Sequence, residues 1–286
     1  ARYISKYIQN FAQNGASNAW DLHNHQNYPN PSDVAGDIWR QCYFGLGANL
    51  NYIIDNGIRK GQWDYVGAAY ALKALMFQMA TDEYGEIIFT EAFKENTSQF
   101  KYDDQQVVYK GVDSLCRLAI IYLQRSDLST SNILLSKGDF IYDGSTAKWL
   151  KFAYGILARN FHRMTNKTGY QPDSVMYYVD KSFASVADDF VIPFDATKND
   201  DTNFFGTYRD NLTTFRQTKM IVGLLDGTAF TGSTVKANRD PRIRHMLSIS
   251  TDTSNGNGGY SGLEPGLADP NSGNKRVAVP FADSIY

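Results

Sequence analysis

Long apolar segments are missing from this chain of 286 residues. No run of about 18 apolar residues could span a bilayer, and the amino terminus has neither the basic nor the apolar part of a signal peptide. Cys42 and Cys116 are the only cysteines, and their wide spacing fits neither a metal motif nor a dense disulfide framework. We expect two buried thiols, and a single bridge between them stays open.

A strong charge of either sign is also absent. The formal net charge is -2, and lysine and arginine do not cluster among aromatic residues, so a nucleic-acid partner is not expected. The G-x-S-x-G nucleophile turn, the G-x-x-x-x-G-K-[ST] phosphate loop and the G-x-G-x-x-G dinucleotide turn are all missing. The chain does have 43% hydrophobic and 14% aromatic residues, enough for a sizeable core and for surfaces that stack on flat ligands.

Residues 142–166 carry the clearest helix prediction. Asp143 and Gly144 are turn residues, and the hydroxyl of Ser145 or Thr146 can accept a bond from the free N–H groups that open a helix. Apolar residues then recur at three- and four-residue intervals, with basic residues mostly on the other side. One face should therefore pack in a core; its members are Trp149, Phe152, Ala153, Ile156, Leu157, Phe161 and Met164.

Helical spacing dominates the rest of the chain as well. No cap precedes Ala1, which predicts that the natural polypeptide extends further upstream. We expect Asp33 to begin one helix and Gly57 to end it, Asp103 or Asp104 to begin another, and Asp173 or Ser174 to begin a third. The expected helices cover residues 1–11, 33–57, 66–80, 103–125, 173–188 and 214–225, the last ended by Gly227, with a short helix or turn at 240–247.

Three segments without helical spacing separate these helices: 15–32, which contains Asn, His, Gly and Pro; 189–211, which is irregular; and 251–274, which is mostly Gly, Ser, Asn and Pro. Strand alternation never lasts more than a few residues. The predicted fold is all-α: a solenoid-like stack of helix pairs with a loop-rich region. We treat residues 1–286 as a single domain truncated at both ends, with a helix-pair core at 33–190 and a loop-rich part at 191–286.

Three segments, in the right order, resemble one protein family. GDFIYDGSTAKWLKFAYGILARNFHRM, residues 138–164, looks like the signature of the SusD/RagB-like outer-membrane nutrient-binding lipoproteins, and residues 68–93 and 240–243 are similar to two further family motifs. Lys73, Ile88 and the pair Tyr154-Gly155 depart from the family wording. The matching signature positions are Asp139, Tyr142, Gly144, Lys148, Trp149, Lys151, Phe152, Ala153, Leu157, Arg159 and Arg163.

The resemblance implies a cell-surface, lipid-anchored protein of the outer membrane that is not an enzyme. Its tetratricopeptide-like helix pairs would dock on a SusC-like TonB-dependent transporter, while a loop-rich face captures a glycan for import. The family's lipid-bearing cysteine is absent from this chain, which also stops well before the usual end of the family. The motifs concern scaffold and transporter-facing parts, so they transfer no ligand-binding residue.

Ligand residues must therefore be inferred from chemistry. Sugar capture needs flat apolar rings for the C–H face of a pyranose, beside amide, carboxylate or guanidinium groups that reach its hydroxyls. Each aromatic residue could instead merely pin its loop to the helices. Three sets meet the requirement: Trp20, Asp21, Asn24, Asn27 and Tyr28; Phe204, Phe205, Tyr208, Arg209 and Asn211; and Tyr260.

Metal motifs are weak, and no cofactor is expected. His23 and His25 have the spacing of a metal pair, but only Asp21 lies near them as a further ligand. Alternate oxygen-bearing residues from Asp195 to Asp201 imitate a calcium loop without its glycine and closing glutamate. A solvated acidic loop is the preferred interpretation, and Ca²⁺ is kept as the alternative.

Two other functions remain open. A helical-repeat scaffold could bind a peptide or protein partner. An all-helical glycoside hydrolase would need a pair of carboxylates across a scissile bond, but it also needs more helix pairs than the chain supplies. The acidic cluster after residue 80 is better explained as the polar rim of a turn; its members are Asp82, Glu83, Glu86 and Glu91.

Overall fold

The structure is a computed structural model that describes residues 2–14, 36–127, 134–195, 197–198, 202–203, 205–206, 211–231, 239–250 and 259–267. The chain divides into two compact units, which are described separately. The helical unit comprises Asp33–Pro193, and the mixed unit comprises Ala1–Ser32 together with Phe194–Tyr286.

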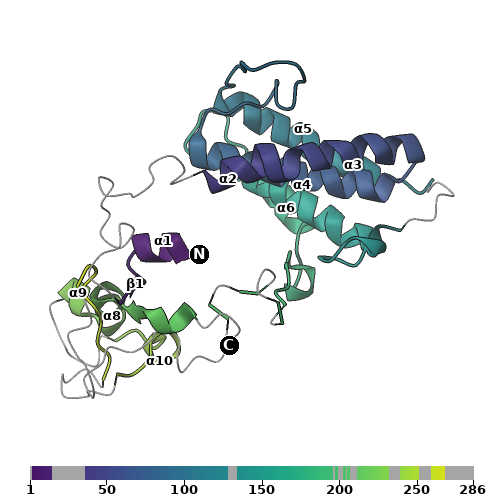
Figure 1. The fold of residues 1–286 in the computed structure, drawn as a ribbon. Coiled ribbons are helices and arrows are strands. Elements are labelled where there is room, and N and C mark those ends of the chain that lie inside the picture. The colour runs from purple at the N-terminus through teal and green to yellow at the C-terminus, as the bar shows by residue number, and fades with distance from the viewer. Residues whose placement is uncertain are drawn as a thin grey trace. The chain divides into compact units, whose positions relative to one another are not determined.

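The helical unit begins with one long helical segment of three parts. Helix α2 (Asp37–Arg40) continues through the π-helical turn η3 (Gln41–Leu46) into α3 (Gly47–Lys60). Gly61 ends α3 in the left-handed conformation, with a φ of 66°, which glycine adopts without steric cost. Helix α4 (Trp63–Tyr84) follows almost at once and packs on α3 (Figure 1). The two form a helix pair.

Three further helices complete this unit. They are α5 (Gln105–Leu123), α6 (Thr146–His162) and α7 (Pro172–Lys181), with 3-10 turns η4 (Leu135–Lys137) and η5 (Val186–Asp188) between or after them. Helix α4 packs on α3, α5 and α6, while α6 also packs on α5 and α7. Figure 1 shows α3 to α6 lying side by side as a stack. The predicted all-α class is confirmed.

Helix α4 is the centre of the stack, which explains why its sequence is apolar nearly all round. Ala71, Ala74 and Ala80 are fully buried in it. Gly67 lets α5 approach closely, because a Cβ built at that position would lie 2.5 Å from Leu123 Cγ and 2.9 Å from the Leu123 backbone nitrogen. Small residues therefore set the spacing between α4 and α5.

The predicted start of α6 is confirmed. Ser145 is the N-cap, and its Oγ accepts the Lys148 N–H at 3.4 Å. The predicted apolar face is buried from Trp149 to Leu157, and Phe161 packs against the core while half-buried. Local capping and a helical stripe were sufficient signals here.

Several predicted helix ends are wrong. Gly57 does not stop α3: it is buried inside the helix, where a Cβ would lie 2.6 Å from Val66 Cγ2. Gln171 precedes α7, which opens with Pro172 rather than with Asp173 or Ser174 as its cap. Proline suits the first position because the N–H it lacks would have no partner within the helix. Asp33 lies outside the described residues.

The mixed unit contains a small antiparallel sheet. Strand β1 (Phe11–Gln13) pairs with β2 (Phe215–Gln217), with Phe11 opposite Gln217. Helix α1 (Arg2–Tyr7) ends before β1, and Gln9 between them has a φ of 59°. The helix predicted over 1–11 is therefore too long, because the three residues of β1 are too few to show a strand pattern by themselves.

Short helices follow in the described part of the mixed unit. The 3-10 turn η6 (Asn211–Thr214) leads into β2, and α8 (Lys219–Asp226) starts at Thr218, whose Oγ1 accepts the Ile221 N–H. Gly227 ends α8 as predicted, with a φ of 86°. Helices α9 (Thr228–Thr231) and α10 (Ile243–Met246) follow. A small core joins α8 to the following segments; it contains Val222, Leu225, Ile243, Leu247 and Tyr260.

The buried side chain of Gln217 ties the segments of this unit together. Its Nε2 donates to the carbonyl oxygens of Ser248 and Ser261 at 3.0 and 2.9 Å, and its Oε1 accepts the Ser248 N–H at 3.1 Å. Leu263 pairs with Thr218 in an isolated parallel bridge. One amide thus satisfies the backbone of two loops, which would otherwise have to find water.

Both cysteines are buried and free, in agreement with the expected thiols. Burial raises the pKa of Cys42 to about 12 and raises that of Cys116 as well, which keeps both thiols protonated and unreactive. Within the described ranges, we find no helix with the length and apolar character required to cross a membrane.

Candidate functional site

The carboxylate of Asp139 organises the turn before α6. Its Oδ1 accepts the N–H groups of Ile141 and Tyr142, each at 3.0 Å, and its Oδ2 accepts the Gly144 N–H at 2.9 Å. The indole Nε1 of Trp149 donates to the same Oδ2 at 2.7 Å. Burial alone would raise the pKa of this carboxyl, but the four donors outweigh it and hold the pKa below its ordinary value.

A second buried carboxylate, that of Asp188, fastens the segment after α7 to α6. It pairs with the Lys151 ammonium at 2.8 Å and accepts the Ala184 N–H at 2.9 Å. Lys151 and then the backbone donors lower the pKa of Asp188. The Tyr142 hydroxyl donates to the Asp188 carbonyl oxygen, and burial raises the pKa of Tyr142 to about 12. These groups hold the scaffold together and are not free to react.

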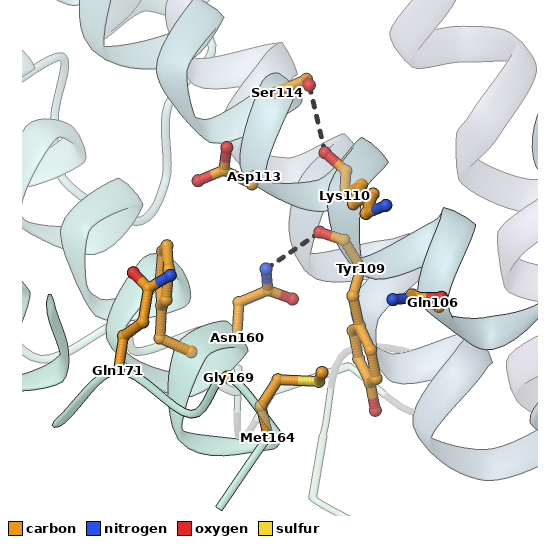
Figure 2. A pocket seen from close by; sticks show the side chains of 10 residues that line it. Gln106, Tyr109, Lys110, Asp113, Ser114, Asn160, Met164, Gly169 and Gln171 are labelled. Carbon is orange, nitrogen blue, oxygen red and sulfur yellow. Dashed lines mark hydrogen bonds between the residues drawn. The ribbon is translucent and has the colours of Figure 1, made fainter. Parts of the chain in front are cut away.

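A cavity of about 380 Å³ opens elsewhere in the helical unit, between α5, the end of α6 and the segment that leads to α7 (Figure 2). All of its lining residues belong to the helical unit. From α5 come Gln106, Tyr109, Lys110, Asp113 and Ser114; from α6 and beyond come Asn160, Phe161, Met164, Gly169 and Gln171. We call this space the α5–α6 pocket.

Asn160 joins the two helices beside the pocket. Its Nδ2 donates to the Tyr109 carbonyl oxygen at 2.9 Å, and its side chain is only 5% exposed. The other amide atom, Oδ1, is buried and has no hydrogen-bond partner among the described residues. Figure 2 shows this amide between Tyr109 on one side and Gln171 on the other. The wall of the pocket thus contains a hydrogen-bond acceptor that lacks a donor.

Asp113 supplies a second such acceptor. Its Oδ2 accepts the Arg117 Nε–H at 2.8 Å, whereas its Oδ1 is buried without a hydrogen-bond partner in the described part of the chain. The bond to Asp113 raises the pKa of Arg117, which keeps the guanidinium charged. Lys110 lies one turn earlier on α5 and is exposed. The charge of Asp113 is therefore balanced within the pocket's surroundings.

A polar network holds the Tyr109 ring at the edge of the pocket. The Tyr109 hydroxyl donates to Asp82 Oδ1 at 2.7 Å, and the Arg163 Nε–H donates to Asp82 Oδ2 at 2.8 Å. Burial and the bond to Asp82 raise the pKa of Tyr109. The ring is therefore a fixed neutral surface rather than an acid or a base.

Most predicted ligand residues cannot be placed. Trp20, Asp21, Asn24, Asn27 and Tyr28 lie outside the described residues, and so do Phe204, Tyr208 and Arg209. Tyr260 is described: it is 8% exposed and packs with Ile243 and Leu247. Phe205 contacts Phe11 and Phe215 edge to face. For these two rings the packing alternative has direct support, and ligand stacking stays a prediction.

Two residues of the acidic cluster after residue 80, Asp82 and Glu91, have structural roles. Asp82 is engaged by Tyr109 and Arg163, and Glu91 Oε2 accepts the Lys101 N–H at 2.8 Å. In the described residues, no group of three or more His, Cys, Asp or Glu side chains could hold a metal ion. His23, His25 and most of the calcium-like segment fall outside them, so the calcium alternative stays a prediction.

Comparison with known families decides the classification. Residues 2–280 match the SusD-like family described as starch-binding and associating with the outer membrane. This chain belongs to the SusD-like family. The resemblance stated from the sequence is thereby confirmed. The family consists of binding proteins rather than enzymes and is associated with the outer membrane, as the resemblance implied. No curated protein matches the sequence.

Solved SusD-like structures agree with this fold. A SusD/RagB family protein from Bacteroides thetaiotaomicron is 28% identical, with a TM-score of 0.64 over 80% of this chain and 48% of that protein. A chitin-binding SusD homologue from Flavobacterium johnsoniae is 21% identical, with a TM-score of 0.63 over 92% of this chain and 51% of that protein. This chain thus spans about half the length of the solved proteins it matches.

An outer-membrane protein of Bacteroides vulgatus, whose name connects it with nutrient binding, gives a similar fit. It is 17% identical, with a TM-score of 0.65 over 94% of this chain and 55% of that protein. At this identity the likeness concerns the fold. The tetratricopeptide-like helix pairs expected of a SusD-like protein correspond to the stack of α3 to α7.

The SusD-like signature now has a physical explanation. Asp139, Tyr142, Gly144 and Trp149 build one hydrogen-bonded turn, because the carboxylate needs donors at these spacings. Gly144 has a φ of 78°, and a Cβ there would lie 2.5 Å from the Ser136 backbone nitrogen, so glycine is required. These signature residues therefore stabilise the fold, and they give no information about a ligand.

No sequence motif predicts the α5–α6 pocket. Its residues are far apart in the chain, and no motif connects Gln106 with Gln171. One signal was available: Asn160 continues the apolar spacing of Ile156 and Leu157 on α6. An amide on a buried face must find partners, so it marks either a packing contact or a binding site.

Proposed function

We propose that this protein captures an oligosaccharide at the cell surface and delivers it to a SusC-like TonB-dependent transporter in the outer membrane. The observation that carries the proposal is the family match over residues 2–280, since that family is described as starch-binding and associating with the outer membrane. Two solved relatives are named as chitin-binding proteins, which supports a polysaccharide nutrient as the ligand class.

The described residues support binding over catalysis. A glycosidase needs two carboxyl groups free to act across one bond. The buried carboxylates of Asp103, Asp139 and Asp188 are instead occupied by backbone N–H groups, Trp149 and Lys151. Their pKa values are lowered, which is opposite to the raised value of a general acid.

The outer side of α7 supports a protein partner for the helical unit. Met176, Tyr177 and Val179 are 60%, 54% and 48% exposed, although the end of a helical stack usually carries a polar face. Apolar residues gathered on one terminal helix are typical of protein-binding surfaces. A transporter is the partner expected for this family, with a lipid anchor holding the full-length protein at the membrane.

Glycan capture is tested with the paired variant Trp20→Ala and Tyr28→Ala. We expect calorimetry with soluble maltodextrins and chitin oligosaccharides to detect binding to the parent protein. The variant should bind at least about tenfold more weakly, a loss of about 1.4 kcal/mol, with an unchanged melting temperature. Tyr102→Ala, which removes a 53% exposed ring in the helical unit, is the matched control.

Three other outcomes would each change the proposed site or the proposed function. Equal affinity in parent and variant would remove the 15–32 loop from the site. Hydrolysis of either oligosaccharide by pure protein would restore the glycoside hydrolase alternative. Binding of no glycan, together with saturable binding of a peptide, would favour the helical-repeat scaffold. Co-purification of a TonB-dependent transporter with the full-length membrane protein tests the partner separately.

A further inference from the structure

The α5–α6 pocket has the dimensions of a small-molecule site. Its volume of about 380 Å³ falls within the range of small-molecule sites, about 300–1,000 Å³. It lies wholly within the helical unit, on α5, α6 and the chain that follows α6, and shares no residue with the loop sets predicted to hold a glycan. A ligand here would occupy a second position.

The orientation of the Asn160 amide is settled by its neighbour. A carbonyl oxygen can only accept, so the Tyr109 oxygen must face Nδ2, and Oδ1 must face away from it. A buried acceptor left without a donor costs folding free energy. A ligand that brings a donor to this oxygen would remove that cost, and the gain would appear as binding affinity.

The second acceptor, Asp113 Oδ1, makes the same demand on a ligand. Both unsatisfied atoms are acceptors, so the ligand must carry at least two donors. A cation is not required, because Arg117 already pairs with Asp113 and Lys110 adds a positive charge nearby. A neutral molecule rich in hydroxyl groups satisfies both oxygens without adding charge.

The remaining wall is apolar and amide-bearing. Tyr109, Phe161 and Met164 supply apolar faces, while Gln106 and Gln171 are exposed amides that can both donate and accept. Figure 2 shows the Met164 and Gln171 side chains on the same side as Asn160, opposite α5. This combination of faces, acceptors and amides matches a pyranose ring, with its C–H face and its ring of hydroxyls.

We propose that the α5–α6 pocket binds one neutral sugar residue through Asn160 and Asp113. The proposal rests on the proposed function, because it takes its ligand from the same nutrient class. It adds a second sugar site on the helical unit, apart from the loops.

The test uses the whole chain and free monosaccharides. Glucose, N-acetylglucosamine, galactose and mannose are titrated while backbone and side-chain amide resonances are followed by NMR, with putrescine as a cationic probe. We expect one sugar to shift the Asn160 and Gln171 side-chain amides, and putrescine to leave them unchanged. Asn160→Leu, a substitution that nearly preserves the side-chain volume, should weaken the binding of that sugar by at least tenfold.

Matched variants separate binding from folding. Asn56→Leu makes the same substitution at an exposed amide on α3, which donates to the Tyr52 carbonyl oxygen, and should leave sugar binding unchanged. If Asn160→Leu were to unfold the chain, Gln171→Ala at the exposed rim tests the same site without touching the core. We expect Gln171→Ala to weaken the binding of the sugar at least threefold.

The outcomes also separate this proposal from the proposed function. No shift with any sugar, shifts with putrescine, or unchanged sugar affinity in both pocket variants would overturn the pocket proposal. Oligosaccharide binding that depends on Trp20 and Tyr28 would then still support glycan capture. Conversely, sugar binding at the pocket in a chain that binds no oligosaccharide would keep the pocket and overturn the capture function.

Discussion

The Trp149 indole donates its N–H to the Asp139 carboxylate at 2.7 Å, and the two rings of Trp149 and Tyr142 meet edge to face with centroids 5.2 Å apart. The Trp149 indole thus hydrogen-bonds a carboxylate and also packs edge to face with an aromatic ring. This contact links the turn before α6 to the core that α6 builds, so the turn and the helix should fold together.

Asp139→Ala should lower the free energy of unfolding by about 3 kcal/mol, because it leaves four donors without an acceptor. Trp149→Phe removes one donor while keeping a ring, and should cost less. Urea unfolding followed by circular dichroism measures both. Asp173→Ala, an exposed acid on α7, is the control and should stay within about 0.5 kcal/mol of the parent.

Asp103 and Asp104 should behave differently, although either could have capped α5. Asp103 is 4% exposed and its Oδ2 accepts the N–H groups of Phe89 and Thr90, whereas Asp104 occupies the N-cap position with no side-chain bond. Asp103→Ala should lower the free energy of unfolding by about 2 kcal/mol, and Asp104→Ala should lower it by less than about 0.5 kcal/mol. Equal losses would show that the N-cap position contributes as much to stability as the bonds of Asp103 to the loop.

Gly67→Ala should destabilise the protein even though alanine favours helices by about 1 kcal/mol over glycine. The added Cβ would lie 2.5 Å from Leu123 Cγ and 2.9 Å from the Leu123 backbone nitrogen, so α4 and α5 must separate. Gly45→Ala is the matched control, because its Cβ meets only the flexible end of Gln41. Thermal melts should show a lower midpoint for Gly67→Ala alone.

Stability should fall in acid from about pH 4 downward. Asp103, Asp139 and Asp188 have pKa values lowered by folding, so their contribution is complete above the ordinary aspartate pKa of about 3.9. Below it the unfolded chain binds protons first, and the contribution disappears as the pH passes through the folded values. Urea midpoints from pH 2 to 7 measure this slope, which should be shallower in Asp139→Ala. An unchanged slope in that variant would show that Asp139 does not titrate with folding.

Sequence patterns were most informative where the decisive interaction is local. Ser145 capped α6 as predicted, and Gly227 ended α8, because both roles depend on residues within one turn. Gly57 was misinterpreted as a helix stop because its purpose is contact with Val66 in the next helix, which spacing cannot reveal.

Tertiary pairing accounts for the other errors. The β1 strand looked like the end of a helix, since its partner Phe215–Gln217 lies far along the chain. The helix predicted over 173–188 ends at Lys181, and Val186 lies exposed in the 3-10 turn η5 beyond it. The candidate pocket depends on Asn160 meeting Tyr109 across two helices, which neither segment predicts by itself.

The pairing of residues 11–13 with 215–217 has a consequence for biosynthesis. Roughly 200 residues separate the two strands, so at about 5–20 residues per second the first strand waits about 10–40 s for its partner to be translated. The entire helical unit emerges during that interval and can condense first. Until then β1 has no strand partner in the growing chain, and an unpaired strand can pair with another chain.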